Sequence, residues 1–142
     1  MSTSEPVRDD ALWTAWKHAA EAVRQRIGAD IASQTGLSDG EFGIVTRLAD
    51  APGRSLRQNE LALSMGWHRS RLSRQLTRMQ ARDLVDRAPQ DDGVLVTLTG
   101  AGAAAAAAAR PVHAQAIHDH LAARLSPAER VTLLQLVTKL GG

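Results

Sequence analysis

The 142-residue chain has no cysteine, no tyrosine and only two lysines. The absence of cysteine excludes disulfides, thiolate metal sites and redox sensing by a thiol. No apolar run approaches the length of a membrane-spanning helix, and the first ten residues have no signal-peptide character. We therefore expect a cytoplasmic, nucleoid-associated protein that does not enter a membrane.

Motifs of common enzyme classes are also missing. The sequence contains no GxSxG, no glycine-rich phosphate loop and no HExxH. His113, His118 and His120 lie at spacings that place ligands poorly on one helix face, although the first and last of them share a face. We therefore predict no enzymatic activity, no cofactor and no metal site, and solvent or an interface accounts for the histidines.

The most informative segment runs from Ser55 to Val85 and reads as a helix, a turn at Gly66 and a second helix. In the second helix Leu72, Leu76 and Met79 form an apolar stripe. The opposite face carries arginines and hydroxyls, namely Ser70, Arg71, Arg74, Thr77 and Arg78. This pattern is typical of a recognition helix, because arginine pairs with guanine edges in the major groove and hydroxyls reach bases or phosphates.

Positive charge is concentrated on this segment. Between Arg54 and Arg87 eight arginines stand against three carboxylates, a net charge of +5, while the whole chain carries only +2. Such a distribution favours contact with phosphate over a merely solvated helical hairpin.

The segments on either side complete a winged helix-turn-helix. Ser55 with Gln58 fits a capping box for the first helix, and Gly66 suits a left-handed C-cap. A strand over 84–87, a turn over 89–93 and a strand over 94–98 predict the hairpin, or wing. Thr99 is the expected N-cap of the next helix.

Further helices are predicted at both ends. A helix over about 9–34 carries an apolar stripe, and a capping box at Ser38–Glu41 starts a second helix. The span 99–125 reads as helical with a kink or a break at Pro111. Ser126-Pro127-Ala128-Glu129 starts the last helix.

The chain resembles the MarR family of bacterial transcription regulators. The matching segments are ELALSMGWHRSRLSRQLTRMQARDLVDR, GVLVTLTGAG and LSPAERVTLLQLVTKL, in the family's order. The resemblance implies a homodimer that binds inverted-repeat operators in double-stranded DNA, usually as a repressor and often released by a small phenolic or amphipathic ligand. The absence of cysteine removes the oxidation-sensing branch of that family.

We predict one mainly helical domain over 1–142 with a small β-hairpin wing. The winged helix-turn-helix occupies about 38–99, a connecting helix about 99–110, and dimerisation helices about 9–35 and 111–142. The two outer helices carry apolar stripes that a lone winged helix does not need, so we expect them to pair with a second copy. Packing within one subunit is the alternative.

The predicted DNA contacts divide into two groups. Those near base edges are Arg69, Ser70, Arg71, Ser73 and Arg74, and those that position the backbone are Arg57, His68, Arg78 and Arg87. The alternative function is a winged-helix protein-interaction module without sequence-specific DNA binding, against which the +5 charge argues. The operator, the regulated genes and the effector do not follow from the sequence.

Aromatic residues are few, so each has a predicted role. Trp67 should pack between the start of the recognition helix and its neighbour. Trp13 and Trp16 could line a pocket for a small aromatic or anionic effector, and the available cations are Arg24, Arg26 and Arg47. Packing in the core or a dimer interface is the favoured interpretation of those two tryptophans.

Two positions depart from the resembled family. The family usually carries an arginine at the wing tip that enters the minor groove, whereas this chain has Asp92 there. Phosphates repel a carboxylate, so we expect a wing that contacts DNA weakly or does not insert. Arg57 stands where the family commonly has a helix-capping hydroxyl, and we expect it to contact a phosphate while Ser55 caps the helix.

Overall fold

The computed structural model describes residues 4–142. The elements, in chain order, are α1 (Asp9–Thr35), α2 (Asp39–Asp50), the 3₁₀ turn η1 (Pro52–Arg54), β1 (Ser55–Arg57), α3 (Gln58–Met65), α4 (Arg69–Ala81), β2 (Val85–Gln90), β3 (Gly93–Leu98), α5 (Gly100–His120), the 3₁₀ turn η2 (Ala122–Arg124) and α6 (Pro127–Gly141). The predicted fold class, a mainly helical winged helix-turn-helix with added terminal helices, is confirmed. Over the described residues, no helix has both the length and the apolar character needed to span a bilayer.

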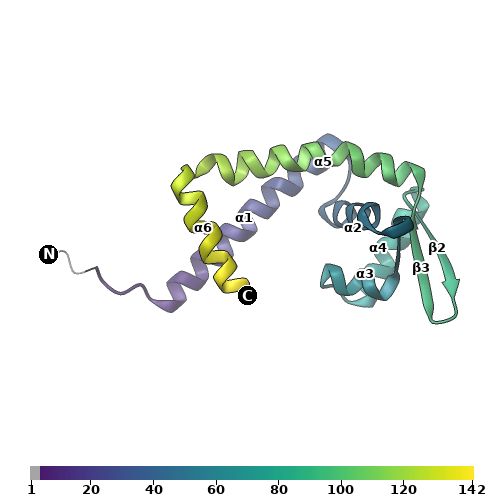
Figure 1. The fold of residues 1–142 in the computed structure, drawn as a ribbon, viewed down its shortest axis with the longest axis horizontal. Coiled ribbons are helices and arrows are strands. Elements are labelled where there is room, and N and C mark those ends of the chain that lie inside the picture. The colour runs from purple at the N-terminus through teal and green to yellow at the C-terminus, as the bar shows by residue number, and fades with distance from the viewer. Residues whose placement is uncertain (1–3) are drawn as a thin grey trace.

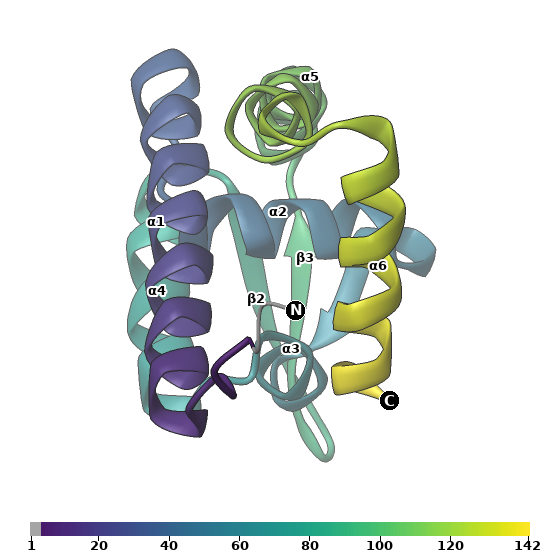
Figure 2. The same ribbon diagram turned by 90° about the vertical axis from the view of Figure 1, so that its left-hand side faces the viewer.

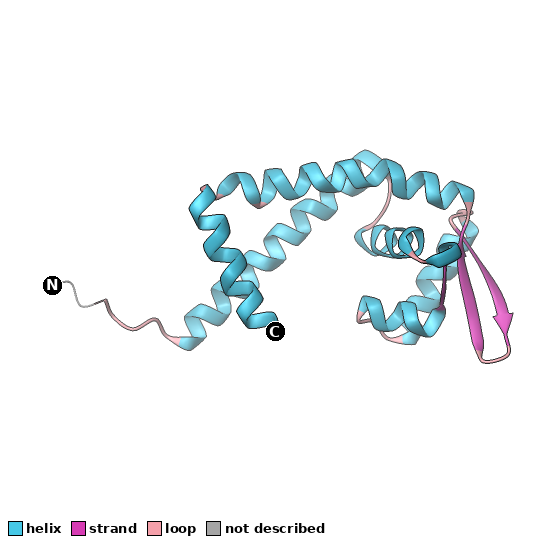
Figure 3. Cartoon of the chain, viewed as in Figure 1, coloured by secondary structure: helices cyan, strands magenta, loops and turns pink. Residues whose placement is uncertain are grey.

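The molecule has two ends joined by α5. Figure 1 shows α2, α3, α4 and the sheet gathered at one end, and α1, α6 and the two termini extending toward the other. Viewed from that second end, α1 and α6 form two separate walls beneath α5 (Figure 2). The β2–β3 hairpin projects at the end opposite the termini (Figure 3).

The apolar core lies at the winged-helix end and includes one residue near the end of α1. Its fully buried side chains are Ile31, Leu37, Ile44, Val45, Leu48, Leu61, Leu72, Leu76, Met79, Val85 and Val96. The alanine tract of α5 packs closely on this core, with Ala106 and Ala109 buried. No residue of α6 is buried, so this helix adds no side chain to the core.

Helix starts follow the predicted caps at three positions. Ser38 and Glu41 form the capping box of α2, and Ser126 and Glu129 form that of α6. The Thr99 hydroxyl accepts from the Gly102 amide at 2.9 Å at the start of α5. Each cap satisfies amides that the first helical turn leaves without partners, which fixes where the helix begins.

The predicted capping box at Ser55 is wrong. Ser55 lies in β1, a short strand that the sequence pattern did not reveal, and it pairs with Thr97 of β3. The two hydroxyls are hydrogen-bonded at 2.8 Å. Helix α3 therefore begins only at Gln58, with Arg57 as its N-cap residue and no capping bond from that side chain.

The wing is longer than predicted. Pro89 and Gln90 belong to β2 rather than to the turn, which shrinks to Asp91 and Asp92 between the paired residues Gln90 and Gly93. Proline is tolerated because β2 is an edge strand, where a missing amide hydrogen removes no bond from an outer neighbour. Gly93 has φ 147°, a value that other residues rarely adopt.

The predicted split near Pro111 is also wrong. Helix α5 continues through Pro111 as far as His120, so the connecting helix and the first part of the second dimerisation segment are one element. Pro111 is exposed, and water can satisfy the carbonyl whose helical partner it removes. The helix ends at His120 instead of near Leu125, and η2 follows it.

We predict that Gly102→Ala strongly destabilises the protein. A Cβ at this position would lie 2.1 Å from the Leu84 carbonyl oxygen and 2.6 Å from Leu98 Cδ1, so α5 would have to move away from the base of the wing. The expected loss in unfolding free energy is about 2–3 kcal/mol. Gly100→Ala is the matched control, because a Cβ there meets no atom within 4 Å. Urea denaturation at one protein concentration measures both, and equal stability of the two variants would contradict this packing account.

Candidate nucleic-acid interface

Helix α4 is held by the apolar stripe predicted for it. Leu72, Leu76 and Met79 are fully buried in the core. His68 is the N-cap residue, and the preceding turn closes on Gly66, which has φ 66° and the left-handed conformation predicted for it. Burial of each such side chain contributes about 1.5–3 kcal/mol, so the orientation of α4 is firmly set.

The opposite face of α4 is open to solvent. Arg69, Ser70, Arg71 and Arg74 are exposed, as are Thr77 and Arg78 one to two turns later. Ser73 is only half-exposed, so it lies at the edge of this exposed face and not at its centre. The structure thus brings together the predicted base-reading residues on one helix, beside the predicted backbone contacts His68 and Arg78.

Arg71 is positioned by Trp67. The Arg71 guanidinium lies over the Trp67 ring, 3.9 Å from the ring centroid, in a cation–π contact. Trp67 is half-buried and packs on the core, and its ring lies against Gly40 of α2, where an added Cβ would come within 2.7 Å of it. Trp67 thus packs on the core at the start of α4, as predicted, and the neighbour that its ring contacts is α2.

The far end of α4 is tied to α2 by an ion pair that the sequence analysis missed. Arg82 donates to the Glu41 carboxylate, whose side chain is only 8% exposed. The other oxygen of Glu41 accepts from the Ser38 amide at 3.0 Å in the capping box. The only sequence signal for Glu41 was that local box, and nothing in the pattern indicated a partner 41 residues away.

The wing is tied to the helices on two sides. Arg87 of β2 donates to Thr77 at 2.8 Å and to Gln80 at 3.1 Å, both on α4. On the other side Arg57 forms an ion pair with Asp92 at the wing tip. Asp92 holds the pKa of Arg57 above its ordinary value, and Arg57 holds the pKa of the Asp92 carboxyl below its ordinary value.

The three residues predicted for an effector pocket do not come together. Arg47 lies on α2 and donates to the Ser64 hydroxyl at 2.7 Å and to the Gly43 carbonyl at 3.0 Å. Trp13 is 61% exposed, with the Lys17 ammonium 5.5 Å from its ring centroid. Of the three, Trp16 alone lines the groove described below, and of the available cations Arg24 lines that groove whereas Arg47 does not.

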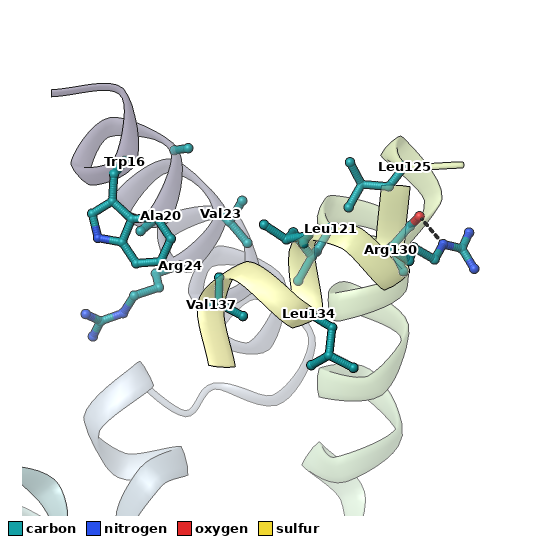
Figure 4. A pocket seen from close by; sticks show the side chains of 12 residues that line it. Trp16, Ala20, Val23, Arg24, Leu121, Leu125, Arg130, Leu134 and Val137 are labelled. Atoms are coloured by element: carbon teal, nitrogen blue, oxygen red, sulfur yellow. Dashed lines mark hydrogen bonds between the residues drawn. The ribbon is translucent and has the colours of Figure 1, made fainter. Parts of the chain in front are cut away.

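An apolar groove of about 560 Å³ separates α1 from α6. Figure 4 shows Trp16, Val23 and Arg24 on the α1 side and Leu134 and Val137 on the α6 side. Arg130 also lines it, but its guanidinium donates to the Ala122 carbonyl at 2.8 Å. Several apolar side chains of these two helices are exposed, namely Leu12, Trp13, Trp16, Val131, Leu134, Leu136 and Leu140, as is Leu121 after the end of α5.

Two of the three histidines of α5 contact a neighbouring helix, whereas His118 is exposed. His113 stacks on Phe42 with ring centroids 4.5 Å apart. His120 lies 2.7 Å from the Asp30 carboxylate and so connects α5 to α1. Their partners lie on different helices of the same chain, α2 and α1.

Comparison with known proteins agrees with this geometry. Residues 35–93, which hold α2 through the wing turn, match the model of the MarR family. No curated protein matches the chain. The resemblance to the MarR family that the sequence motifs indicate is therefore confirmed for the segment that builds the candidate interface.

Solved structures extend the likeness to the whole fold. Sco3205 from Streptomyces coelicolor, a MarR family transcriptional regulator in complex with DNA, aligns with a TM-score of 0.83 at 23% identity over 97% of this chain and 90% of its own. Rv2887 from Mycobacterium tuberculosis, a MarR family protein also in complex with DNA, aligns at 0.72 and 26% over 98% and 100%. BpsR from Bordetella bronchiseptica, whose DNA binding is regulated by 6-hydroxynicotinic acid, aligns at 0.79 and 21% over 96% and 99%.

We predict that Trp67→Leu releases the Arg71 side chain without unfolding the domain. The indole ring current should shift the Arg71 guanidinium resonances upfield in the wild type, because the group lies over the ring face. In the variant these signals should move to the values of a solvated arginine, while those of Arg74 stay in place. Unchanged Arg71 resonances in nuclear magnetic resonance spectra of a folded variant would show that the stack does not form in solution.

Proposed function

We propose that this protein is a sequence-specific double-stranded DNA-binding transcription regulator that acts as a homodimer on an inverted repeat, as a repressor. The observation that carries the proposal is the exposed arginine face of α4, held by a fully buried stripe beside a projecting wing. A chromosomal target implies action in the cytoplasm, at the nucleoid.

Charge and shape support a DNA partner. The segment with the +5 charge runs from the end of η1 through β1, α3 and α4 into β2, so the charges gather at one end of the molecule. A straight helix with arginines along one side suits the width of the major groove. Sco3205 and Rv2887, which are similar to this chain in fold, are both known in complex with DNA, and this supports the proposal.

The structure refines the proposed division of contacts. Arg69, Ser70, Arg71 and Arg74 occupy the first half of α4 and would face base edges, since later turns rise out of the groove. Ser73 would lie at the margin of that contact. His68 and Arg78 would meet phosphates, and the Gln75 amide oxygen accepts from Arg78 at 2.6 Å. Arg87, fastened to α4, would bring the wing to the backbone.

The dimer would form through α1 and α6. The apolar side chains on these helices stay exposed in one chain, and burying them against a second copy recovers a hydrophobic gain of about 25 cal/mol for each Å². A twofold pairing would place two α4 helices about one DNA turn apart, which matches an inverted repeat.

A small effector would act from the same end. Trp16 offers an aromatic face on the α1 wall of the groove. Arg24 lines the same wall, and its guanidinium, 3.9 Å from the Asp39 carboxylate, would have to turn inward to meet an anionic group. Because the groove lies between the proposed dimerisation helices, a ligand there would change their spacing and hence that of the two α4 helices. The effect of 6-hydroxynicotinic acid on BpsR is an example with an aromatic acid.

The α4 contacts are tested by alanine variants on two DNAs. A preferred operator is first selected from random fragments with the purified protein. Arg71→Ala or Arg74→Ala should cost about 1–3 kcal/mol per half-site on that operator and relax preference at one base pair. Arg78→Ala should weaken binding to operator and random DNA about equally. Equal losses on both DNAs for Arg71 and Arg74 would reassign them to the backbone.

The dimer is tested by one charge on α6. Leu134→Glu should shift the protein toward monomers, because Leu134 is 66% exposed in one chain and a carboxylate there is costly only when a second copy covers it. Leu63→Glu is the matched control, an 83% exposed leucine on α3. Light scattering at micromolar concentration gives the mass of each. A wild-type monomer that still binds the operator would overturn the dimer proposal.

A further inference from the structure

The wing tip carries an ion pair within the proposed DNA surface. Asp92 stands in the two-residue turn of the β2–β3 hairpin, and Arg57 is the last residue of β1 and the N-cap residue of α3. Their side chains form a salt bridge although both are exposed, 42% for Arg57 and 70% for Asp92. Arg57, which the sequence predicts to contact a phosphate, is thus paired with the Asp92 carboxylate at the wing tip.

The pair lies where the wing tip extends beyond the rest of the sheet. The β1–β3 ladder is short and ends where Arg57 pairs with Leu95. The hairpin continues beyond that point to Gly93 and the turn, so its tip extends past the strand that supports it. The contact between Arg57 and Asp92 connects this projecting tip to the start of α3, just as Arg87 connects the other wing strand to α4.

The energetic effect of the pair is mainly electrostatic. Exposed salt bridges contribute little to folding stability, so the pair does not hold the fold together. It does set the charge that DNA meets, because each cation that neutralises a phosphate steepens the salt dependence of binding by about 0.9. A carboxylate bound to Arg57 cancels that charge. Because Arg57 lowers the pKa of Asp92, the carboxylate stays ionised at neutral pH and would lose its charge only in acid.

We propose that Arg57 and Asp92 form a self-neutralising latch between the start of α3 and the wing tip, which keeps Arg57 from binding phosphate. The latch is a specificity determinant. It removes an attraction that acts on every DNA sequence and leaves the arginines of α4 to discriminate among them. This inference rests on the proposed function, since it concerns how the same surface meets DNA.

The latch makes different predictions for single and double variants. Asp92→Asn frees Arg57, so affinity for a labelled duplex of random sequence should rise about three- to tenfold near 0.1 M salt, with the salt slope steeper by about one. Arg57→Gln leaves a carboxylate without its partner and should weaken binding about two- to fivefold. The double variant, which loses both charges, should return to within about twofold of the wild type with an unchanged slope.

Asp91→Asn is the matched control. Asp91 lies beside Asp92 in the same turn, and within the described residues 4–142 it takes part in no salt bridge. The substitution changes the net charge equally but frees no arginine, so the salt slope should stay at the wild-type value. This comparison separates release of Arg57 from a general gain of positive charge.

Two results would overturn the latch. A double variant whose salt slope is shallower by about one would show that Arg57 binds phosphate despite Asp92. If the wild type, the two single variants Asp92→Asn and Arg57→Gln, and the double variant all had the same affinity and the same salt slope, the pair would lie away from the DNA.

A measurement without DNA keeps the latch separate from the proposed function. Nuclear magnetic resonance titration of the Asp92 carboxyl should give a higher pKa in Arg57→Gln than in the wild type. An unchanged pKa would show that the pair is not formed, whatever the protein binds. Failure of the wild type to bind any duplex in a salt-dependent way would instead overturn the proposed function.

Discussion

The burial of the apolar stripe of α4 is the constraint on which the rest of the structure depends. Leu72, Leu76 and Met79 are fully buried in the core that α2 and α3 share. Because these side chains fix the rotation of α4 about its own axis, the arginines on the far side can face only outward. The Glu41–Arg82 pair at one end and the Trp67–Arg71 stack at the other then fix the helix along its length.

The two ends of the molecule divide the proposed work. The winged-helix end contains nearly all of the buried core, whereas α6 has no buried residue and most of α1 is exposed. The apolar side chains that stay exposed at the α1–α6 end are available to pack against a second copy. Helix α5 runs between the two ends of the molecule. Altering the α1–α6 groove would therefore change the placement of α4 through a helix packed on both α1 and α2.

Local patterns predicted much of the fold. The 3.6-residue period identified the buried face of α4, and hydroxyl–carboxylate spacing gave the starts of α2 and α6, because these signals lie within one or two helical turns. The capping box predicted at Ser55 was wrong because that prediction also relied on local spacing alone. The spacing of Ser55 to Gln58 fits a capping box, but the partner of Ser55 is Thr97, 42 residues later. Pro111 was expected to kink or split a helix, yet α5 continues through it, because the loss of one exposed hydrogen bond is too small to end the helix.

The candidate site shows the same limit. Sequence placed the arginines of α4 correctly on one exposed face, and it identified Asp92 as the unusual residue of the wing. It could not find the ion pair with Arg57, whose partners lie 35 residues apart and meet only when β1 joins the sheet. Arg47 was one of three cations offered for the effector site, and its hydrogen bonds place it between α2 and α3, whereas Arg24 lines the groove.

The central claim is that α4 reads the major groove while the latched wing tip stays out of the minor groove. Methylation interference on the selected operator tests both parts at once, because guanine N7 faces the major groove and adenine N3 the minor groove. The account predicts that N7 methylation of guanines in both half-sites blocks binding, and that N3 methylation of adenines on the flanking side has no effect. Interference from adenine N3 alone would contradict it.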